Sequence, residues 1–210
     1  MSTACTVYLK NCPCNKLPMS KTALVVVAFY KPQADDPLLN RVVGSLDGPN
    51  CHVELAFPVQ QNAAAVGMFD VAMDAVCVYF DERVEMCKKR YSRDNYQLMY
   101  VPVTPQQWRS MRTRATDIVR SQAAFSRYAM LATFAKLLPT LHDAAEPDAT
   151  CCSVLTAQIL QSGDVLDKSI NSRRVTPSSL QRLILQQTHV PALAVGCAPV
   201  KLQKLRVQCA

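Results

Sequence analysis

The segment that most restricts the possible folds is residues 22–30, which read TALVVVAFY. The segment has the length of a strand, is rich in β-branched side chains, and is apolar on both of its alternating faces. A strand that is apolar on both faces lies inside a sheet that other elements cover. We therefore expect a sheet with residues 22–30 as a central strand.

Other strands are expected along the chain. Residues 52–57 alternate, so that His52, Glu54 and Ala56 face one side of a sheet. The further strands predicted are residues 68–73 and 76–80, on either side of a turn at residues 74 and 75, and residues 96–103. Residues 81–94 are charged and mixed, and no strand is assigned there.

Two helix starts carry clear signals. Thr104, Pro105 and Gln107 form a capping box with proline at the first helical position. Thr176 and Pro177 repeat this start later in the chain. The other helices expected are residues 37–43, residues 125–138, and a helix that follows Thr150 and ends at Gly163. Together these elements predict an α+β domain in which helices pack on one antiparallel sheet.

The composition fits a single domain. With 210 residues, of which 50% are hydrophobic and 19% are charged, the chain can bury a core of its own. We expect a core at residues 22–187, an irregular cysteine-rich arm at residues 1–21 and a strand-like tail at residues 188–210. No apolar run approaches the roughly 20 residues that span a bilayer, and the layout of a secretory signal is missing. A cytoplasmic protein is therefore expected.

Most of the ten cysteines are expected to be free thiols. The missing secretory signal and the apolar surroundings of Cys77 and Cys197 favour buried thiols over a disulfide framework. The cysteines nearest to a zinc pattern are Cys5, Cys12, Cys14 and Cys87. Their Cys-x-Cys spacing is not that of the usual zinc knuckle, and no second pair follows at a fitting interval. Neither a metal nor a cofactor is expected.

The formal charge of +7 raises the question of anionic partners. The basic residues are scattered, without a stripe interleaved with aromatic residues and without a known nucleic-acid-binding motif. Solvated helix faces explain most of them. Examples on one expected helix are Arg109, Arg112, Arg114 and Arg120. No specific binding of nucleic acid is expected, whereas a weak attraction to anionic membrane surfaces is compatible with the charge.

A cysteine and a histidine 100 residues apart carry the chemistry. Thr150 is expected to cap a helix with Cys151 and Cys152 at its first two positions, and His52 opens the strand at residues 52–57. The positive end of a helix and a nearby imidazole both favour the thiolate, which is the nucleophilic form of cysteine. Papain-like enzymes place a helix cysteine against a strand histidine in this way. Here the histidine comes first.

Neighbouring residues offer alternatives to both members of this pair. Cys152 lies on the side of the helix that is expected to pack on the sheet, whereas Cys151 lies nearer the flank. That side also carries Leu155, Thr156 and Ile159. We therefore favour Cys152 as the nucleophile, and Ser153 has nothing to activate it as easily as a thiol. His142 and His189 are expected at the surface, in a polar linker and just before a proline.

A third polar group usually orients the imidazole in such sites. If the strand of His52 forms a hairpin with residues 68–73, Asp70 lies opposite Glu54 and on the same face as His52. Either carboxylate is then placed to orient the imidazole, and the sequence does not separate them. The backbone N–H of Cys152 is expected to contribute to an oxyanion hole.

At these residues the chain resembles the circularly permuted NlpC-like papain fold. That superfamily includes lecithin retinol acyltransferase, bacterial cell-wall and amide hydrolases, and proteins of large DNA viruses. Three blocks match in order over residues 22–187: ALVVVAFY and PLLNRVVGS before HVELAF, then NYQLMYVPVTPQQWRSM, and then TCCSVLTAQILQSGDVL trailed by RRVTPSSLQRLI. His52 and Cys152 occupy the family's base and nucleophile positions. Cys151 replaces the residue that usually precedes the nucleophile.

The resemblance implies a thiol hydrolase or acyltransferase in which Cys152 attacks an amide or ester, and His52 acts as base and then as acid. Its substrates would be peptides, other amides or lipid esters. The doubled cysteine fits an alternative, a catalytically idle member that serves as a structural or interaction protein. A nucleic-acid-binding module rests on charge alone. The match is closest in character to viral members, which implies a protein of the host cytoplasm or of a virion, in contact with other virion proteins.

Overall fold

The structure is a computed structural model, and it describes residues 22–46, 48–58, 72–78, 84–121 and 150–187. Its strands are β1 (Ala23–Tyr30), β2 (His52–Pro58), β3 (Met73–Val78), β4 (Val84–Lys89), β5 (Ser92–Arg93) and β6 (Tyr96–Val103). Its helices are α1 (Leu38–Leu46), α2 (Pro105–Arg120), α5 (Cys152–Ser162), the short 3-10 helix η5 (Ser172–Arg174) and α6 (Pro177–Gln187). The expected arm at residues 1–21, helix at residues 125–138 and tail at residues 188–210 lie outside the described residues.

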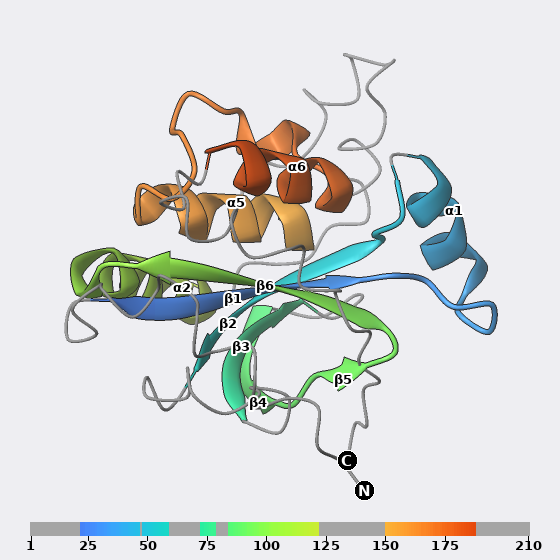
Figure 1. Cartoon of the computed structure of the whole chain (residues 1–210), viewed down its shortest axis with the longest axis horizontal. Helices are drawn as coiled ribbons and strands as arrows, with labels where there is room; N and C mark the ends of the chain where they lie inside the picture. The colour runs from blue at the N-terminus through green and yellow to red at the C-terminus, as the bar shows by residue number, and fades with distance from the viewer. Residues whose placement is uncertain (1–21, 47, 59–71, 79–83, 122–149, 188–210) are drawn as a thin grey trace, which may run out of the picture.

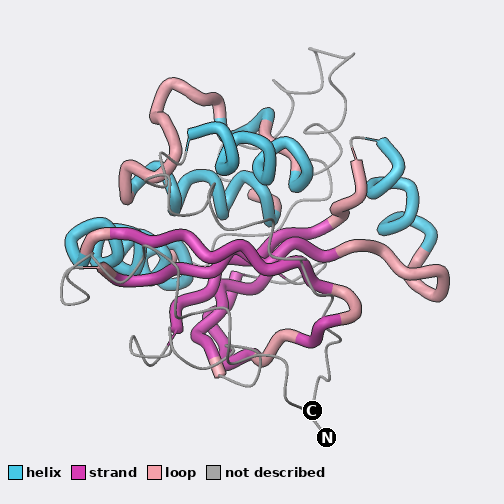
Figure 2. The backbone as a smooth tube through the Cα atoms, viewed as in Figure 1, coloured by secondary structure: helices cyan, strands magenta, loops and turns pink. Residues whose placement is uncertain are grey.

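The described elements form an α+β arrangement around a five-stranded antiparallel sheet of order β4-β3-β2-β1-β6 (Figure 1). Helices α5 and α6 lie on one face of the sheet, while β3 and β4 bend away on the other side (Figure 2). The expected α+β class and the antiparallel sheet are confirmed. No helix among the described residues is both long enough and apolar enough to cross a membrane.

Strand β1 is the central strand that the sequence predicts. It pairs with β2 on one side and with β6 on the other. Val25 and Val27 lie in the apolar core under the helices, whereas Val26 and Ala28 lie in a second apolar cluster on the opposite face, and all four are fully buried. The burial of both faces explains why this segment contains no charged residue.

The expected turn at residues 74 and 75 is wrong, and residues 68–71 of the expected strand before it lie outside the described residues. Strand β3 runs without a break from Met73 to Val78, through the residues assigned to a turn. Asp74 suggested that turn, but its carboxylate accepts a hydrogen bond from Arg112 of α2 at 2.7 Å, so the strand tolerates it. Strand β4 was not expected at all. Its exposed Glu85 and Lys88 suit the edge of the described sheet, where charged side chains reach water.

Helix α2 begins as the sequence predicts. The Thr104 hydroxyl accepts a hydrogen bond from the backbone N–H of Gln107 at 3.2 Å, and the Gln107 side chain accepts one from the backbone N–H of Thr104 at 2.9 Å. The helix buries Met111, Ala115 and Ile118. The reciprocal cap and this apolar stripe fix where the helix starts and which side meets the sheet.

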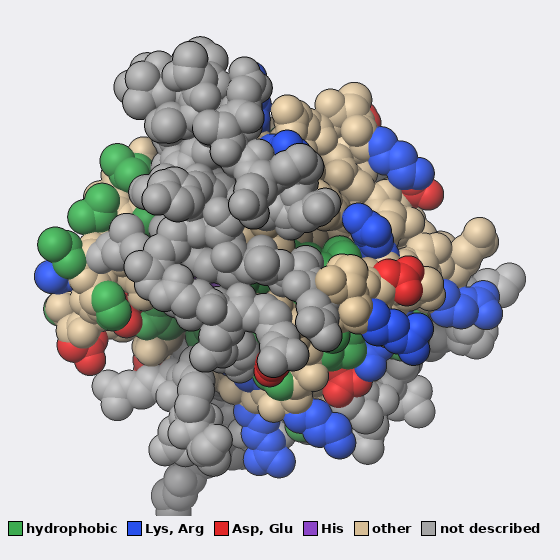
Figure 3. Space-filling view, turned by 180° about the vertical axis from the view of Figure 1, so that it is seen from behind, with side chains coloured by type: hydrophobic (Ala, Val, Ile, Leu, Met, Phe, Trp, Pro, Cys, Tyr) green, Lys and Arg blue, Asp and Glu red, His purple; other side chains and the backbone are tan. Residues whose placement is uncertain are grey.

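Most of the arginines on α2 face solvent. Arg109, Arg114 and Arg120 are exposed, whereas Arg112 is half-buried, pairs with Asp74 and lies 5.1 Å from the centre of the Phe57 ring. On the face drawn in Figure 3, Lys and Arg side chains alternate with acidic and uncharged ones. In the described part of that face, acidic side chains therefore lie among the basic ones.

Helix α5 packs across β2 and ends against α2. Its predicted end at Gly163 is confirmed. A Cβ atom at Gly163 would lie only 2.6 Å from Cγ of Met111, so the close approach of the two helices requires glycine there. The expected cap is wrong by one residue: Cys151, rather than Thr150, is the N-cap, and its side chain makes no capping hydrogen bond.

Candidate functional site

The first residue of β2 and the first residue of α5 meet at one end of the sheet. These residues are His52 and Cys152, and their side chains interact closely enough that each shifts the pKa of the other. The meeting point is fixed by apolar packing behind it, where Val53 and Leu55 of β2 share a buried core with Leu155 of α5. The sheet and helix therefore bring together two side chains that are 100 residues apart in the chain.

The environment of Cys152 favours the thiolate. Burial raises the pKa of Cys152. The charge and hydrogen bond of His52, together with the backbone N–H groups of Val53 and Ser153, lower it by more. The resulting pKa therefore lies below the ordinary value of a thiol. Burial instead raises the pKa of Cys51 to about 12. The thiol at the start of α5 is thus the one among these two that ionises readily.

His52 links the thiol to a carboxylate. Its Nε2 atom lies 3.1 Å from Oε1 of Glu54, and the imidazole also interacts with Cys152. Burial lowers the pKa of the imidazole, but the thiolate of Cys152 and the carboxylate of Glu54 raise it to about 10. The imidazolium is therefore the preferred form of His52 at neutral pH.

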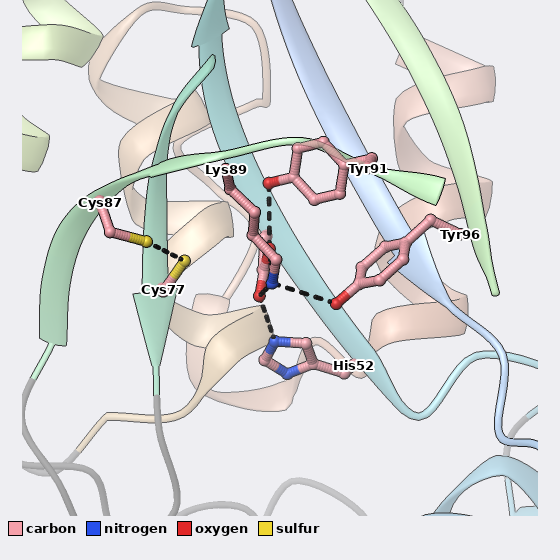
Figure 4. Close-up of polar contacts among 7 residues, drawn as sticks. His52, Cys77, Cys87, Lys89, Tyr91 and Tyr96 are labelled. Atoms are coloured by element: carbon pink, nitrogen blue, oxygen red, sulfur yellow. Dashed lines mark hydrogen bonds and ion pairs between the residues drawn. The ribbon is translucent and has the colours of Figure 1, made fainter. Parts of the chain in front are cut away.

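Glu54 is itself held by several donors (Figure 4). The Lys89 ammonium contacts both carboxylate oxygens, at 2.7 and 2.9 Å, and the Tyr91 hydroxyl donates to Oε2 at 3.0 Å. Burial raises the pKa of the carboxyl, but His52 and Lys89 lower it to about 2. Glu54 is therefore an anion in a fixed orientation, although its side chain is only 4% exposed.

The neighbours of Cys152 point elsewhere. Cys151 is buried in a separate apolar cluster with Val43, Cys51 and Val154. Its sulfur lies 3.6 Å from Oγ of Ser153. Cys152 was expected on the side of the helix that packs on the sheet. The other residues of that side are all buried: Leu155, Thr156 and Ile159. Cys151 therefore packs toward α1, away from the imidazole.

Of the four candidate residues, the structure brings three together. Cys152, His52 and Glu54 form one continuous chain of contacts. Asp70 lies outside the described residues, and the hairpin that placed it opposite Glu54 has the wrong register. In the observed sheet, Phe57 pairs with Asp74 and Leu55 pairs with Val76.

Lys89 and Tyr91 were missed in the sequence. Lys89 closes a strand that the charged pattern concealed, and Tyr91 follows directly after it. Their link to Glu54 depends on how β3 and β4 pair, since Lys89 lies opposite Met73. The only signal in the sequence was Tyr91 itself, an aromatic residue within the charged run of residues 81–94.

The cysteines within the described residues are free thiols: Cys51, Cys77, Cys87, Cys151 and Cys152. The sulfurs of Cys77 and Cys87 lie 3.2 Å apart on the face of the sheet that carries Glu54. In the same part of the chain, no group of three or more His, Cys, Asp or Glu side chains is arranged to hold a metal ion. Cys5, Cys12, Cys14, His142 and His189 lie outside it.

No protein family model matches the chain, and neither a curated protein nor a solved structure matches it significantly.

Proposed function

We propose that the chain is a cysteine hydrolase or acyltransferase with a circularly permuted, NlpC-like papain fold. The observation that carries the proposal is the chain of contacts from the Cys152 thiol at the start of α5, through His52, to the buried carboxylate of Glu54. A nucleophile, a base and a group that orients the base are the parts that acyl transfer through cysteine requires.

The order of elements supports the permuted fold. A strand and helix, β1 and α1, precede the histidine strand β2, and β6 leads into the capped helix α2 before the cysteine helix α5. This order is the one in which the three sequence blocks resemble the permuted superfamily. The proposed identity of the fold rests on that order together with the meeting of His52 and Cys152.

The reaction proceeds in two halves. The Cys152 thiolate attacks the carbonyl carbon of an amide or ester, and the His52 imidazolium then gives its proton to the departing nitrogen or oxygen. The products of this half are a thioester on Cys152 and a free amine or alcohol. Water or another acceptor next attacks the thioester while His52 takes its proton, and the thiolate is released. Glu54 keeps the imidazole oriented and stabilises its charged form.

The acceptable substrates are peptides, other amides and lipid esters, all of which offer the same carbonyl carbon to the thiolate. Association with virion proteins or with an anionic membrane surface belongs to the same proposal, as does a place in the host cytoplasm or in a virion. The backbone N–H of Cys152 is the proposed oxyanion donor, because it lies at the start of the helix.

One observation favours a second candidate, a structural member of the fold without activity. Cys152 is only 6% exposed, so a substrate has little surface through which to reach it. The two candidates differ in the reactivity of this thiol, since an idle site has no reason to keep it ionised and accessible to reagents.

Selective alkylation of Cys152 tests the proposal. The full chain is treated with iodoacetamide at pH 7, and the labelling rate of each cysteine is followed by peptide mass spectrometry. We expect Cys152 to react faster than Cys51 and Cys151, because its pKa is lowered while burial raises that of Cys51. Replacing His52 with Ala should remove the advantage.

The matched control is Cys151→Ala, which removes the neighbouring thiol and leaves the His52 contact in place. Its Cys152 should keep the fast rate. Equal, slow labelling of Cys152 in the wild type and in the His52→Ala variant would contradict the enzyme and favour the structural candidate.

A further inference from the structure

Lys89 reaches the candidate site from a distant strand. It lies at the end of β4, which is separated from β2 by β3 in the sheet. Its ammonium nevertheless contacts both oxygens of Glu54 and lies 3.3 Å from the Tyr96 hydroxyl, so each of its three protons has a partner. The side chain is only 16% exposed. A lysine buried this far needs a strong reason to remain charged.

Two tyrosine rings complete the surroundings of this ammonium. The nitrogen lies 5.5 Å from the centre of the Tyr91 ring and 5.3 Å from that of the Tyr96 ring, within the range of cation–π attraction. The hydroxyl of Tyr91 also donates to Glu54. Lys89 and Glu54 are therefore fixed relative to each other by contacts from three strands and a connecting segment (Figure 4).

The charges at the site alternate in sign. When Cys152 is ionised, its thiolate lies next to the imidazolium of His52, which lies next to the carboxylate of Glu54, and that carboxylate lies next to the ammonium of Lys89. His52 and Lys89 share the same oxygen of Glu54, at 3.1 and 2.7 Å. Without Lys89, the buried site would carry one uncompensated negative charge.

We propose that Lys89 is a positioning residue of the Cys152 site, which holds Glu54 as an oriented anion and thereby sets the lowest pH at which the Cys152 thiolate persists. This inference rests on the proposed function. An extra negative charge in a buried site disfavours a thiolate, and a carboxylate that has lost a cation takes up a proton at higher pH. The first effect moves ionisation of the thiol toward higher pH directly when Lys89 loses its charge. The second acts through His52, because a protonated Glu54 no longer supports the imidazolium that lowers the pKa of Cys152.

Of the other titratable groups that face this network, Tyr91, Cys77 and Cys51 are neutral at working pH. Burial first, and then neighbouring anions, raise the pKa of the Tyr91 hydroxyl and of the Cys77 thiol. Among the described residues, the titratable groups that face Glu54 or Lys89 are His52, Cys77, Cys87, Tyr91 and Tyr96. Those that face Cys152 are Cys51 and His52. Lys89 is therefore the cation that, together with His52, balances the charge of Glu54.

The test is the pH dependence of Cys152 alkylation by iodoacetamide in the full chain, with Lys89→Met, Lys89→Arg and Lys88→Met variants. Lys88 is the matched control, because it precedes Lys89 on the same strand and is exposed. We expect the midpoint of the acid limb to rise by about one pH unit in Lys89→Met. It should rise much less in Lys89→Arg and not at all in Lys88→Met.

If Lys89 serves only in packing, Lys89→Met should lower the rate of Cys152 alkylation without moving the midpoint of its acid limb. An unchanged midpoint in Lys89→Met, with fast and His52-dependent labelling in the wild type, would overturn the role of Lys89 and leave the proposed function standing. Wild-type labelling that is slow and independent of His52 would overturn both.

A stability cycle keeps the inference open to disproof if Lys89→Met alone fails to fold. The thermal midpoints of Lys89→Met, Glu54→Gln and the double variant are compared with that of the wild type. Lys89→Met should destabilise the wild type but stabilise Glu54→Gln, because it removes a buried cation whose anionic partner is gone. An equal loss in both backgrounds would contradict the charge pairing.

Discussion

At the scale of single residues, the position of Glu54 allows one carboxylate to contact both His52 and Lys89. It lies two residues after His52, so both side chains lie on the same face of β2. The carboxylate thus contacts Nε2 of the imidazole without help from a loop. That spacing was available from the sequence, whereas the donors that hold Glu54 were not, because they come from β4 and the segment after it.

The acid limb of stability follows from the same carboxylate. The pKa of Glu54 falls from 4.5 to about 2 on folding, so its contribution is complete above pH 4.5 and disappears as the pH falls toward 2. We expect the free energy of unfolding of the wild type to drop over this range more steeply than that of Glu54→Gln. Urea unfolding at a series of pH values measures both slopes.

Glu85→Gln is the control for this measurement, since Glu85 is an exposed carboxyl on β4. Its slope should follow that of the wild type. Parallel slopes for the wild type and Glu54→Gln would show that the buried carboxylate does not gain its protons in this range.

At the scale of elements, the position of α5 is set at both of its ends. Cys152 contacts His52 at the first residue, and Gly163 meets Met111 of α2 just past the last. We expect Gly163→Ala to destabilise the protein by about 1–3 kcal/mol, because the added methyl group overlaps the Met111 side chain and lies 3.2 Å from the backbone oxygen of Gln107. Chemical unfolding gives this value.

The overlap can be relieved as a control. In a Met111→Ala background the same glycine substitution should cost markedly less, because the space beyond it is then open. If Gly163→Ala costs the same in both backgrounds, the contact between α2 and α5 does not fix the helix.

Elements with strong local signals could be predicted from the sequence, and those that depend on distant partners could not. β1 and β2 show apolar or alternating patterns, and α2 carries its own capping box. β3 and β4 contain Asp74 and Lys89, whose partners Arg112 and Glu54 are more than 30 residues away. A polar residue in a strand looks like a turn or a solvated loop until the partner that satisfies it is known.

The candidate site divides in the same way. The pair of His52 and Cys152 followed from a strand pattern and a helix start, which are local features. The contribution of Lys89 depends on sheet register, and register was the part of the fold that the hairpin prediction placed wrongly.

At the scale of the whole molecule, the sheet depends on its helical layer. Val53, Leu55 and Phe57 of β2 share a core with residues of α5 and α6, such as Ile159 and Ile184. We expect a chain that ends at residue 149 to expose this face and to bind a hydrophobic dye far more strongly than the full chain. Dye fluorescence at equal protein concentration measures the difference. Equal dye binding by the two chains would show that this face of the sheet is not exposed when α5 and α6 are missing.

The distance of 100 residues between His52 and Cys152 also has a consequence for synthesis. A ribosome takes on the order of 5–20 s to add that length, while small domains fold within seconds or faster. The strand that carries the base therefore leaves the ribosome well before the thiol exists. Until α5 and α6 follow, its apolar face lacks its cover. Any reactivity at Cys152 then depends on the helical layer, which delays such chemistry until α5 and α6 have been made and have packed on the sheet.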